Sequence, residues 1–467
     1  MGRKAILTAP FAHALNPFSR RKYPLLFALE EVVLRNQSRH ALRIAALTLS
    51  VAATAGTALA APSCGTDPVV LNSYFETGFP LPTRLAEEFT RQFPNVTFDI
   101  KEDQFANMME NSPRILSEPN APDLIRVPSI TDLVANNLLR NLDADFDALG
   151  WDQFPAGQLV QLRVEEGGRP RGTGSLYGMG INYSMTGVFY NKELAAQIGM
   201  TEAPKSVAEL DALMAKAKEA GILPVMQWNK GTGGFAFPLQ NLMGAYGAPE
   251  PINDWIFQKD GATINTADNL KAAEHLEGWI KAGYFPSDAN AIEYFQMMSR
   301  FMGGEGLFMF NGDWESGNLD TNAKDKFGFF IMPSLEEGGR HASMSSPLTF
   351  GISANAANPE CAAFFLDWVA RNEEARKINV EVGGSNPGGP TDLPMPAVEP
   401  GSVTEQSLTA GATLAQDNGA MDFIANATGA IFAAGWTPEL QKMVGGQQNA
   451  AGLLEAVQRE YETQLSR

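Results

Sequence analysis

Beyond about residue 65, the hydrophobic positions change repeatedly between the spacing of a strand and that of a helix. Residues 69–71 form a short apolar run, which predicts a strand, followed by a polar and aromatic loop over residues 72–78. Apolar residues then recur at four-residue intervals over residues 85–93, as on one face of a helix. Residues 96–100 alternate apolar and polar side chains and predict a second strand. A strand, a helix and a strand in this order predict a parallel sheet in an α/β fold.

The alternation continues to the end of the chain. Extended segments are predicted over residues 122–127, 181–190, 223–227, 306–310 and 345–354. Helices are predicted over residues 266–282, 292–302 and 450–465. Further helices are predicted to begin at Ser206, near Phe235, and at Asn358 and Pro359, and another is predicted to end at Leu139. Turns or bends are predicted at Asn311 and Gly312, as an exposed bend over residues 167–172, and over 383–390.

Residues 177–199 read YGMGINYSMTGVFYNKELAAQIG, an extended run followed by a helix that Gly199 ends. This stretch resembles the mid-chain signature of family 1 extracellular solute-binding proteins, the sugar-type receptors of bacterial ABC importers, of which maltose-binding protein is the familiar example. GEGLFMFNGDWESGNL at residues 304–319 and FGISANAANPECAAFFLDWVA at residues 350–370 carry the rest of the resemblance. The order and spacing of the three segments together are specific to this family, although each motif taken alone is only weakly specific.

The resemblance implies a type II periplasmic-binding-protein fold, in which two α/β lobes enclose a ligand cleft and the chain crosses between them three times. We expect residues 61–183 and 347–390 to form one lobe, and residues 184–346 and 391–467 to form the other. The resemblance also implies a sugar ligand, closure of the lobes by hinge motion, and delivery to the transmembrane permease subunits of an ABC importer. We expect the receptor to be a monomer.

The first 60 residues differ from the rest in charge and composition. They contain eight Lys or Arg residues and two acidic ones, and they end in an uncharged, Ala-rich run closed by Ala58, Leu59 and Ala60. This pattern predicts a secretory signal peptide cleaved near Ala60, hence a periplasmic protein, with true initiation near residues 32–34. A membrane anchor is the alternative, but the run is short for a span. Cleavage changes the formal charge from −18 to −24, which disfavours nucleic acid as a partner.

The chain has two cysteines, Cys64 beside the predicted cleavage site and Cys361 far downstream. In an oxidising periplasm they could form a disulfide bond that ties the amino terminus to a distant helix. The alternative is one exposed and one buried thiol, and the sequence favours neither.

Ligands of open α/β sheets bind beyond the carboxyl ends of the strands. Sugars offer C–H faces that pack on aromatic rings, and hydroxyl groups that need polar partners. The candidates that follow predicted strand ends are Tyr74, Glu76, Ser129, Trp228, Asp313 and Trp314. For Trp314 the alternative is a core position, but the matching aromatic residue in the family stacks on sugar. For Asp313 the alternative is a helix N-cap.

Four further candidates lie beside the predicted crossings: Asn182, Thr349, Ser385 and Asn386. For these residues turn formation is the alternative role. Arg126 lies within a predicted strand, and we expect it to pair with a surface carboxylate. Because no Lys/Arg cluster accompanies the candidate residues, a neutral ligand is favoured.

Enzyme functions have weaker support. His275 and His341 are the only histidines beyond the leader, and neither has a second histidine at metal-ligand spacing. The sequence contains no G-x-S-x-G elbow and no P-loop. An iron-binding receptor is disfavoured because no Tyr-Tyr pair occurs. We therefore predict no catalytic residue, no metal and no cofactor. A secreted glycoside hydrolase needs only two carboxylates and stays the alternative, since the chain has 53 acidic residues.

Overall fold

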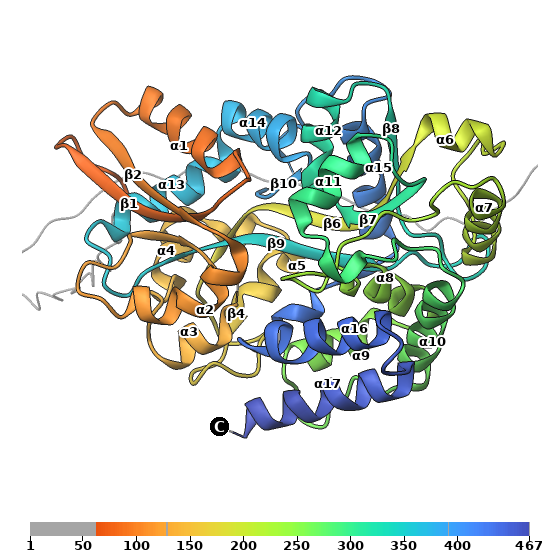
Figure 1. Ribbon diagram of the computed structural model, residues 1–467. Helices are drawn as coiled ribbons and strands as arrows, with labels where there is room; N and C mark the ends of the chain where they lie inside the picture. Colours follow the sequence, from red (N-terminus) through yellow and green to blue (C-terminus); the bar gives the residue numbers. More distant parts are fainter. Residues whose placement is uncertain (1–61, 128, 391, 467) are drawn as a thin grey trace, which may run out of the picture. The chain divides into compact units, whose positions relative to one another are not determined.

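The structure is a computed structural model that describes residues 62–127, 129–390 and 392–466 (Figure 1). The predicted signal peptide and its cleavage site lie outside the described residues. In the part of the chain that is described, no helix is both long and apolar enough to cross a membrane.

The strands are β1 Val69–Glu76, β2 Val96–Asp103, β3 Leu124–Arg126, β4 Arg163–Val164, β5 Ser175–Leu176, β6 Met179–Asn191, β7 Phe308–Gly312, β8 Phe327–Phe330, β9 Ser343–Ile352, β10 Asn386–Pro387 and β11 Ala420–Met421. The helices of the first half are α1 Leu81–Gln92, α2 Phe105–Leu116, α3 Thr131–Ala135, α4 Asp143–Leu149, α5 Ala156–Leu159, α6 Lys192–Gln197, α7 Val207–Glu219 and α8 Ala236–Tyr246. Those of the second half are α9 Pro249–Ile256, α10 Ala267–Lys281, α11 Tyr294–Met302, α12 Ser316–Asn322, α13 Pro359–Arg371, α14 Glu373–Gly383, α15 Val403–Gln416, α16 Thr437–Val444 and α17 Ala450–Leu465. Short helical turns are η1 Trp151–Gln153, η2 Val160–Leu162, η3 Ala289–Ala291, η4 Asp313–Glu315, η5 Ile424–Asn426 and η6 Ile431–Trp436.

The opening β1–α1–β2 unit matches the predicted order, and β1 pairs in parallel with both β2 and β3. The loop predicted over residues 72–78 is wrong up to Glu76, because β1 continues through these positions. Asn72 is accommodated by Asp123, because its backbone N–H and its side-chain Nδ2 both donate to Asp123 Oδ2, at 3.0 and 3.4 Å. Extension of β1 carries Glu76 to the carboxyl end of the sheet.

Two long strands, β6 and β9, pair antiparallel with each other and connect the two parts of the sheet (Figure 1). At one end, β9 pairs with β3 and β10 pairs with β6. At the other end, β6 pairs with β7 and with β8. The sheet is therefore mixed rather than all parallel.

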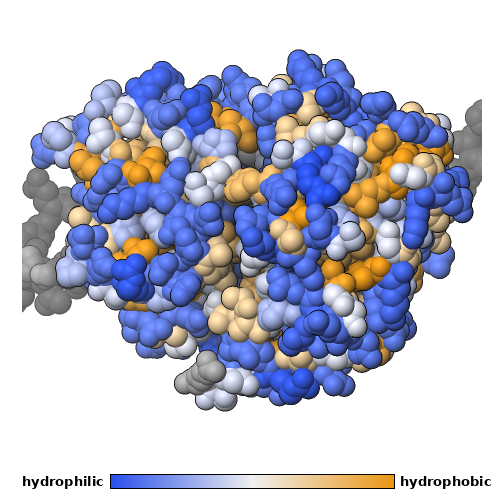
Figure 2. Space-filling model, viewed as in Figure 1, coloured by the Kyte–Doolittle hydropathy of each residue, from blue (hydrophilic) through white to orange (hydrophobic). Residues whose placement is uncertain are grey.

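The buried apolar residues form two large clusters, and β6 and β9 pass from one to the other. The first cluster spans positions from Met185 to Met344 and resumes at Val403. The second includes positions up to Ile181 and resumes at Phe350, with a smaller third cluster beside it. On the face shown in Figure 2, by contrast, hydrophilic residues dominate and hydrophobic ones lie in separate patches.

A disulfide bond joins Cys64 to Cys361 on α13, with an S–S distance of 2.01 Å. It ties the first described residues to the second apolar cluster, in which Cys361 is buried and against which Cys64 packs.

Three further local predictions are wrong. The strand predicted over residues 223–227 is reduced to a single bridge between Val225 and Phe308, since Pro224 has no N–H to donate. Asn311 and Gly312 form no turn, because they extend β7 opposite β6. The helix predicted through Leu139 ends at Ala135, shortly before a residue of positive φ.

The bend predicted over residues 167–172 is not exposed at Arg171. This guanidinium is buried and forms an ion pair with Asp422 at 2.6 Å. Its second N–H group donates to the carbonyl of Asn426 at 3.2 Å, and its backbone N–H donates to the carbonyl of Phe257. These partners belong to a distant part of the sequence, so local turn chemistry did not indicate them.

Candidate functional site

A cavity of about 360 Å³ lies where β1 and β3 end and where β6 and β9 pass between the two apolar clusters. Five of the predicted site residues line it: Glu76, Asn182, Trp228, Trp314 and Thr349. The wall also contains aromatic residues that were not predicted: Phe79, Phe105, Phe237, Tyr294, Phe295, Phe350, Phe423 and Phe432. The cavity thus combines many ring faces and edges with a few polar groups.

The aromatic wall is held by ring contacts. Trp228 packs edge-on against Tyr294, with centroids 5.0 Å apart, and lies 5.2 Å from Phe237. Trp314 also contacts Phe237, at 5.9 Å. Trp228 is almost fully buried, whereas Trp314 is partly exposed. Of the two tryptophans, Trp314 therefore has more ring surface accessible to a ligand.

Phe79 and Phe295 meet at the rim of the cavity, with ring centroids 6.4 Å apart. Phe79 follows β1, whereas Phe295 belongs to α11 near the other apolar cluster. Phe295 is about half exposed and is one of three large apolar side chains that are exposed to this degree in the described residues. A side chain at Gly78 would collide with the Phe295 ring, so the two segments approach closely here.

The polar side of the cavity contains an acidic and a basic side chain at neighbouring strand ends. Arg126 Nε lies 3.8 Å from Glu76 Oε2, and the guanidinium lies over the ring of Phe105 at 5.7 Å. Burial raises the pKa of Glu76, and the charge of Arg126 opposes that rise. Burial likewise lowers the pKa of Arg126, and Glu76 opposes that change. The prediction that Arg126 pairs with a surface carboxylate is wrong, because its partner Glu76 is mostly buried and both residues line the cavity.

Two buried polar atoms of the cavity wall, one of them in this pair, have no hydrogen-bond partner in the described part of the chain. Arg126 Nε has no hydrogen-bond partner within the described residues, and neither has Asn182 Oδ1, which also lines the cavity. Buried polar atoms of this kind are costly unless a ligand or water satisfies them. Thr349 is less available, because its hydroxyl donates to the Pro347 carbonyl at 3.2 Å.

The other predicted residues do not line the cavity. Tyr74 is buried and donates its hydroxyl to Asp103 Oδ2 at 2.9 Å. Ser129 lies outside the cavity wall, and Asn386 pairs with Tyr183 in the sheet. Asp313 and Ser385 lie behind the wall, in a buried hydrogen-bonded group.

That group joins three segments near the crossing strands. Ser385 Oγ donates to Asp313 Oδ1 at 2.8 Å and lies 3.0 Å from Ser184 Oγ. The N-cap of η4 is Gly312, so Asp313 does not have the alternative capping role. Burial raises the pKa of Asp313 well above its usual value of 3.8, although the hydrogen bonds oppose this rise.

The raised pKa of Asp313 predicts a pH-dependent stability. The folded state holds the proton more tightly than the unfolded state, so the stabilisation is complete below the unfolded-state pKa and is lost as pH rises through the folded-state pKa. Asp313→Asn lacks this titration, and its stability relative to the wild type should therefore rise as the pH increases above the ordinary carboxyl pKa of 3.8. Urea unfolding at several pH values measures the difference, and a constant difference across the series would contradict the prediction.

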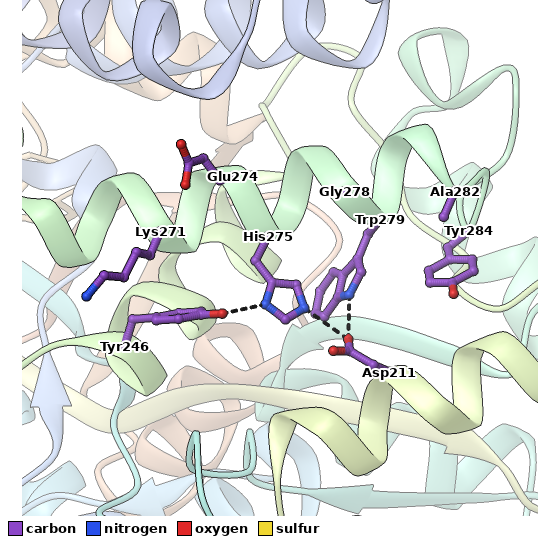
Figure 3. Close-up of a pocket in the computed structure, with 9 residues that line it drawn as sticks. All are labelled: Asp211, Tyr246, Lys271, Glu274, His275, Gly278, Trp279, Ala282 and Tyr284. Carbon is purple, nitrogen blue, oxygen red and sulfur yellow. Dashed lines mark hydrogen bonds and ion pairs between the residues drawn. The ribbon is translucent and has the colours of Figure 1, made fainter.

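A second cavity, of about 670 Å³, lies on α10 and its neighbours α7 and α8 (Figure 3). Its polar groups are bonded to one another: His275 Nε2 and Trp279 Nε1 both lie within 3.0 Å of Asp211 Oδ1, and the Tyr246 hydroxyl lies 2.8 Å from His275 Nδ1. Because a carboxylate only accepts, His275 Nε2 donates to Asp211 Oδ1. These bonds tie three helices together and leave His275 without free hydrogen-bonding capacity.

No group of three His, Cys, Asp or Glu side chains suited to a metal ion occurs in the described ranges.

Of the two cavities, the one of about 360 Å³ is the candidate site, because only this one combines strand ends, aromatic faces and unpaired polar atoms.

Comparison with known proteins defines the family. Residues 78–376 match the family model described as bacterial extracellular solute-binding protein. The chain belongs to this family. The sequence resemblance that pointed to it is thereby confirmed. The match includes the three motif segments, and the structure brings these together, because β6 of the first pairs with β7 of the second and with β9 of the third.

Individual relatives are distant. The "Probable sugar-binding periplasmic protein" of Mesorhizobium japonicum is 22% identical over 201 residues, which are 42% of this chain and 45% of that protein. The match thus spans less than half of the relative's length.

Solved structures cover more of the chain. A "Chitin oligosaccharide binding protein" has a TM-score of 0.71 and 18% identity, over 86% of this chain and 100% of the other. "Maltose bound T. maritima MalE3" has a TM-score of 0.66 and 17% identity, over 85% and 99% of the two chains. "SBP RafE in complex with raffinose" has a TM-score of 0.63 and 17% identity, over the same shares. The predicted α/β fold of the two-lobed solute-binding type is confirmed.

The candidate site extends beyond the segment that the family model matches. Gly383, Phe423, Asn426 and Phe432 line the cavity, although all four lie after residue 376. The carboxyl-terminal part of this solute-binding protein is therefore part of the candidate site.

Proposed function

We propose that this solute-binding protein is the periplasmic receptor of an ABC importer, that it binds a carbohydrate in the cavity between the two apolar clusters, and that it delivers this ligand to the membrane permease. The observation that carries the proposal is the wall of aromatic rings beside buried, unpaired polar atoms. Rings suit the C–H faces of sugars, and the polar atoms suit their hydroxyl groups. The names of the similar proteins, which mention chitin oligosaccharide, maltose and raffinose, point the same way.

Within this proposal, Trp314 and Trp228 supply ring surface, and Glu76, Arg126 and Asn182 pair with hydroxyl groups. Glu76 and Arg126 have opposite charges at close distance, so the site as a whole favours a neutral ligand. A charged sugar would meet one repelling partner whatever its sign.

We further propose that residues 61–183 and 347–390 form one lobe and residues 184–346 and 391–467 the other. The change from one apolar cluster to the other between Ile181 and Met185, and between Met344 and Phe350, supports this division. Hinge motion at β6 and β9 would open the cavity, and ligand would favour the closed state through contacts with both lobes. The receptor acts as a monomer, performs no chemistry and binds no nucleic acid.

A thermal-shift screen tests the ligand class. Protein purified from the periplasm and refolded to remove bound ligand is heated with maltose, diacetylchitobiose, raffinose and common monosaccharides. At about 100 times its dissociation constant, a ligand should add about 2.7 kcal/mol of stability. Recovery of the sugar unchanged would support a receptor, and recovery of cleaved sugar would favour the glycoside hydrolase. Absence of a shift with every sugar would contradict the carbohydrate proposal.

A further inference from the structure

The hydroxyl of Tyr294 is the centre of a hydrogen-bond network behind Trp314. It accepts from Trp314 Nε1 at 2.7 Å and from Asn311 Nδ2 at 3.2 Å, and it donates to Glu315 Oε1 at 2.6 Å. A phenol has one proton to donate and two lone pairs to accept with, so these bonds use its full capacity. The direction of each bond is therefore determined.

Glu315 fixes the far end of this network. Its side chain is buried, and its second oxygen accepts from Asn318 Nδ2 at 2.7 Å. It is not among the residues that line the cavity, whereas Tyr294 and Trp314 both are. Burial raises the pKa of Glu315, and the bonds from Asn318 and Tyr294 oppose that rise. Because both oxygens are engaged, the carboxyl group has one orientation and offers Tyr294 one acceptor.

We propose that Glu315 is a positioning residue for ligand binding, which acts through the Tyr294 hydroxyl to hold the Trp314 indole in one orientation at the cavity. Trp314 is the middle residue of the short helical turn η4 and is only partly buried, so packing leaves part of its ring without contacts. The bond from its Nε1 supplies the missing constraint. What the ring then binds rests on the proposed function, but the orientation itself does not.

Two variants separate the parts of the network. Tyr294→Phe keeps the ring that packs on Trp228 and removes only the hydroxyl. Glu315→Leu removes the acceptor, and Glu315→Gln restores an acceptor oxygen at nearly the same size. The matched control is Glu305→Gln, which changes an exposed carboxylate that pairs with Arg300 instead.

The indole N–H signals of the seven tryptophans report the orientation in ligand-free protein. Trp314→Phe identifies the Trp314 signal in a ¹H–¹⁵N spectrum. We expect Tyr294→Phe and Glu315→Leu to shift this signal, Glu315→Gln to leave it near its wild-type position, and Glu305→Gln to leave it unchanged. An unshifted signal in both Tyr294→Phe and Glu315→Leu would overturn the proposal.

Binding is measured on the same variants with maltose, diacetylchitobiose and raffinose as probes. Loss of preorganisation at one side chain should weaken affinity about tenfold in Tyr294→Phe and Glu315→Leu, and less in Glu315→Gln. Equal affinity in Glu315→Leu and wild type would contradict a positioning role. If the wild type binds no probe, the carbohydrate proposal fails, while the indole signals still decide whether the network orients Trp314.

Discussion

Replacing Trp314 by alanine should weaken carbohydrate binding about 100-fold or more. A tryptophan at the centre of a binding site commonly contributes at least about 2 kcal/mol, and a loss of about 2.7 kcal/mol corresponds to a factor of 100. Trp314 is the partly exposed tryptophan of the cavity wall, and its ring is held by Tyr294 and Phe237. Removal of the indole therefore deletes both the contact surface and the preorganisation. Isothermal titration of the sugar found in the thermal-shift screen measures the effect.

Two controls separate loss of binding from loss of folding. Trp314→Phe keeps a ring without the Nε1–H bond and should bind more tightly than Trp314→Ala. Trp279→Phe removes an indole N–H that bonds to Asp211, at the second cavity, and should leave affinity unchanged. The melting temperature of each variant shows whether the protein remains folded. Wild-type affinity in Trp314→Ala would remove Trp314 from the site.

The elements with the strongest periodicity could be predicted from the sequence. α17 has the bounds expected from its apolar spacing, and the opening strand, helix and strand occur in the expected order. Gly199 follows α6 with a positive φ, as a helix-terminating glycine should. In these segments local preference and tertiary contacts favour the same conformation. The strand ends therefore lie near one another, and five predicted residues line one cavity.

The rest of the site depends on contacts that sequence order does not reveal. Tyr294 and Phe295 open an ordinary amphipathic helix, and only the fold places them opposite Phe79. Arg126 was expected to face a surface carboxylate because an isolated arginine in a strand gives no sign of a partner in the cavity wall 50 residues away. Asp313 follows the end of a strand, as a ligand-binding residue would. Because β7 extends to Gly312, however, Asp313 is buried behind the cavity wall.

The second large effect is expected on the free energy of unfolding, when Arg171 is replaced. Arg171→Ala should lower the free energy of unfolding by about 3–5 kcal/mol, because it leaves Asp422 buried without its charged partner. The ion pair is only 2.6 Å long, and both side chains are almost completely buried. Urea unfolding measures the change. The matched control is Arg84→Ala, whose exposed partner Glu87 makes a pair that is expected to contribute at most about 1 kcal/mol.

The same ion pair bears on the proposed hinge. Arg171 belongs to the first proposed lobe and Asp422 to the second, and Ser346 on the crossing strand β9 donates to Asp422 Oδ1 at 3.0 Å. A pair attached to a crossing strand lies close to the axis of a hinge motion, where displacements are small. We therefore expect Arg171→Ala to lose stability while the ligand still adds its stabilisation. A destabilisation below about 1 kcal/mol would show that Asp422 is satisfied by its remaining partners alone.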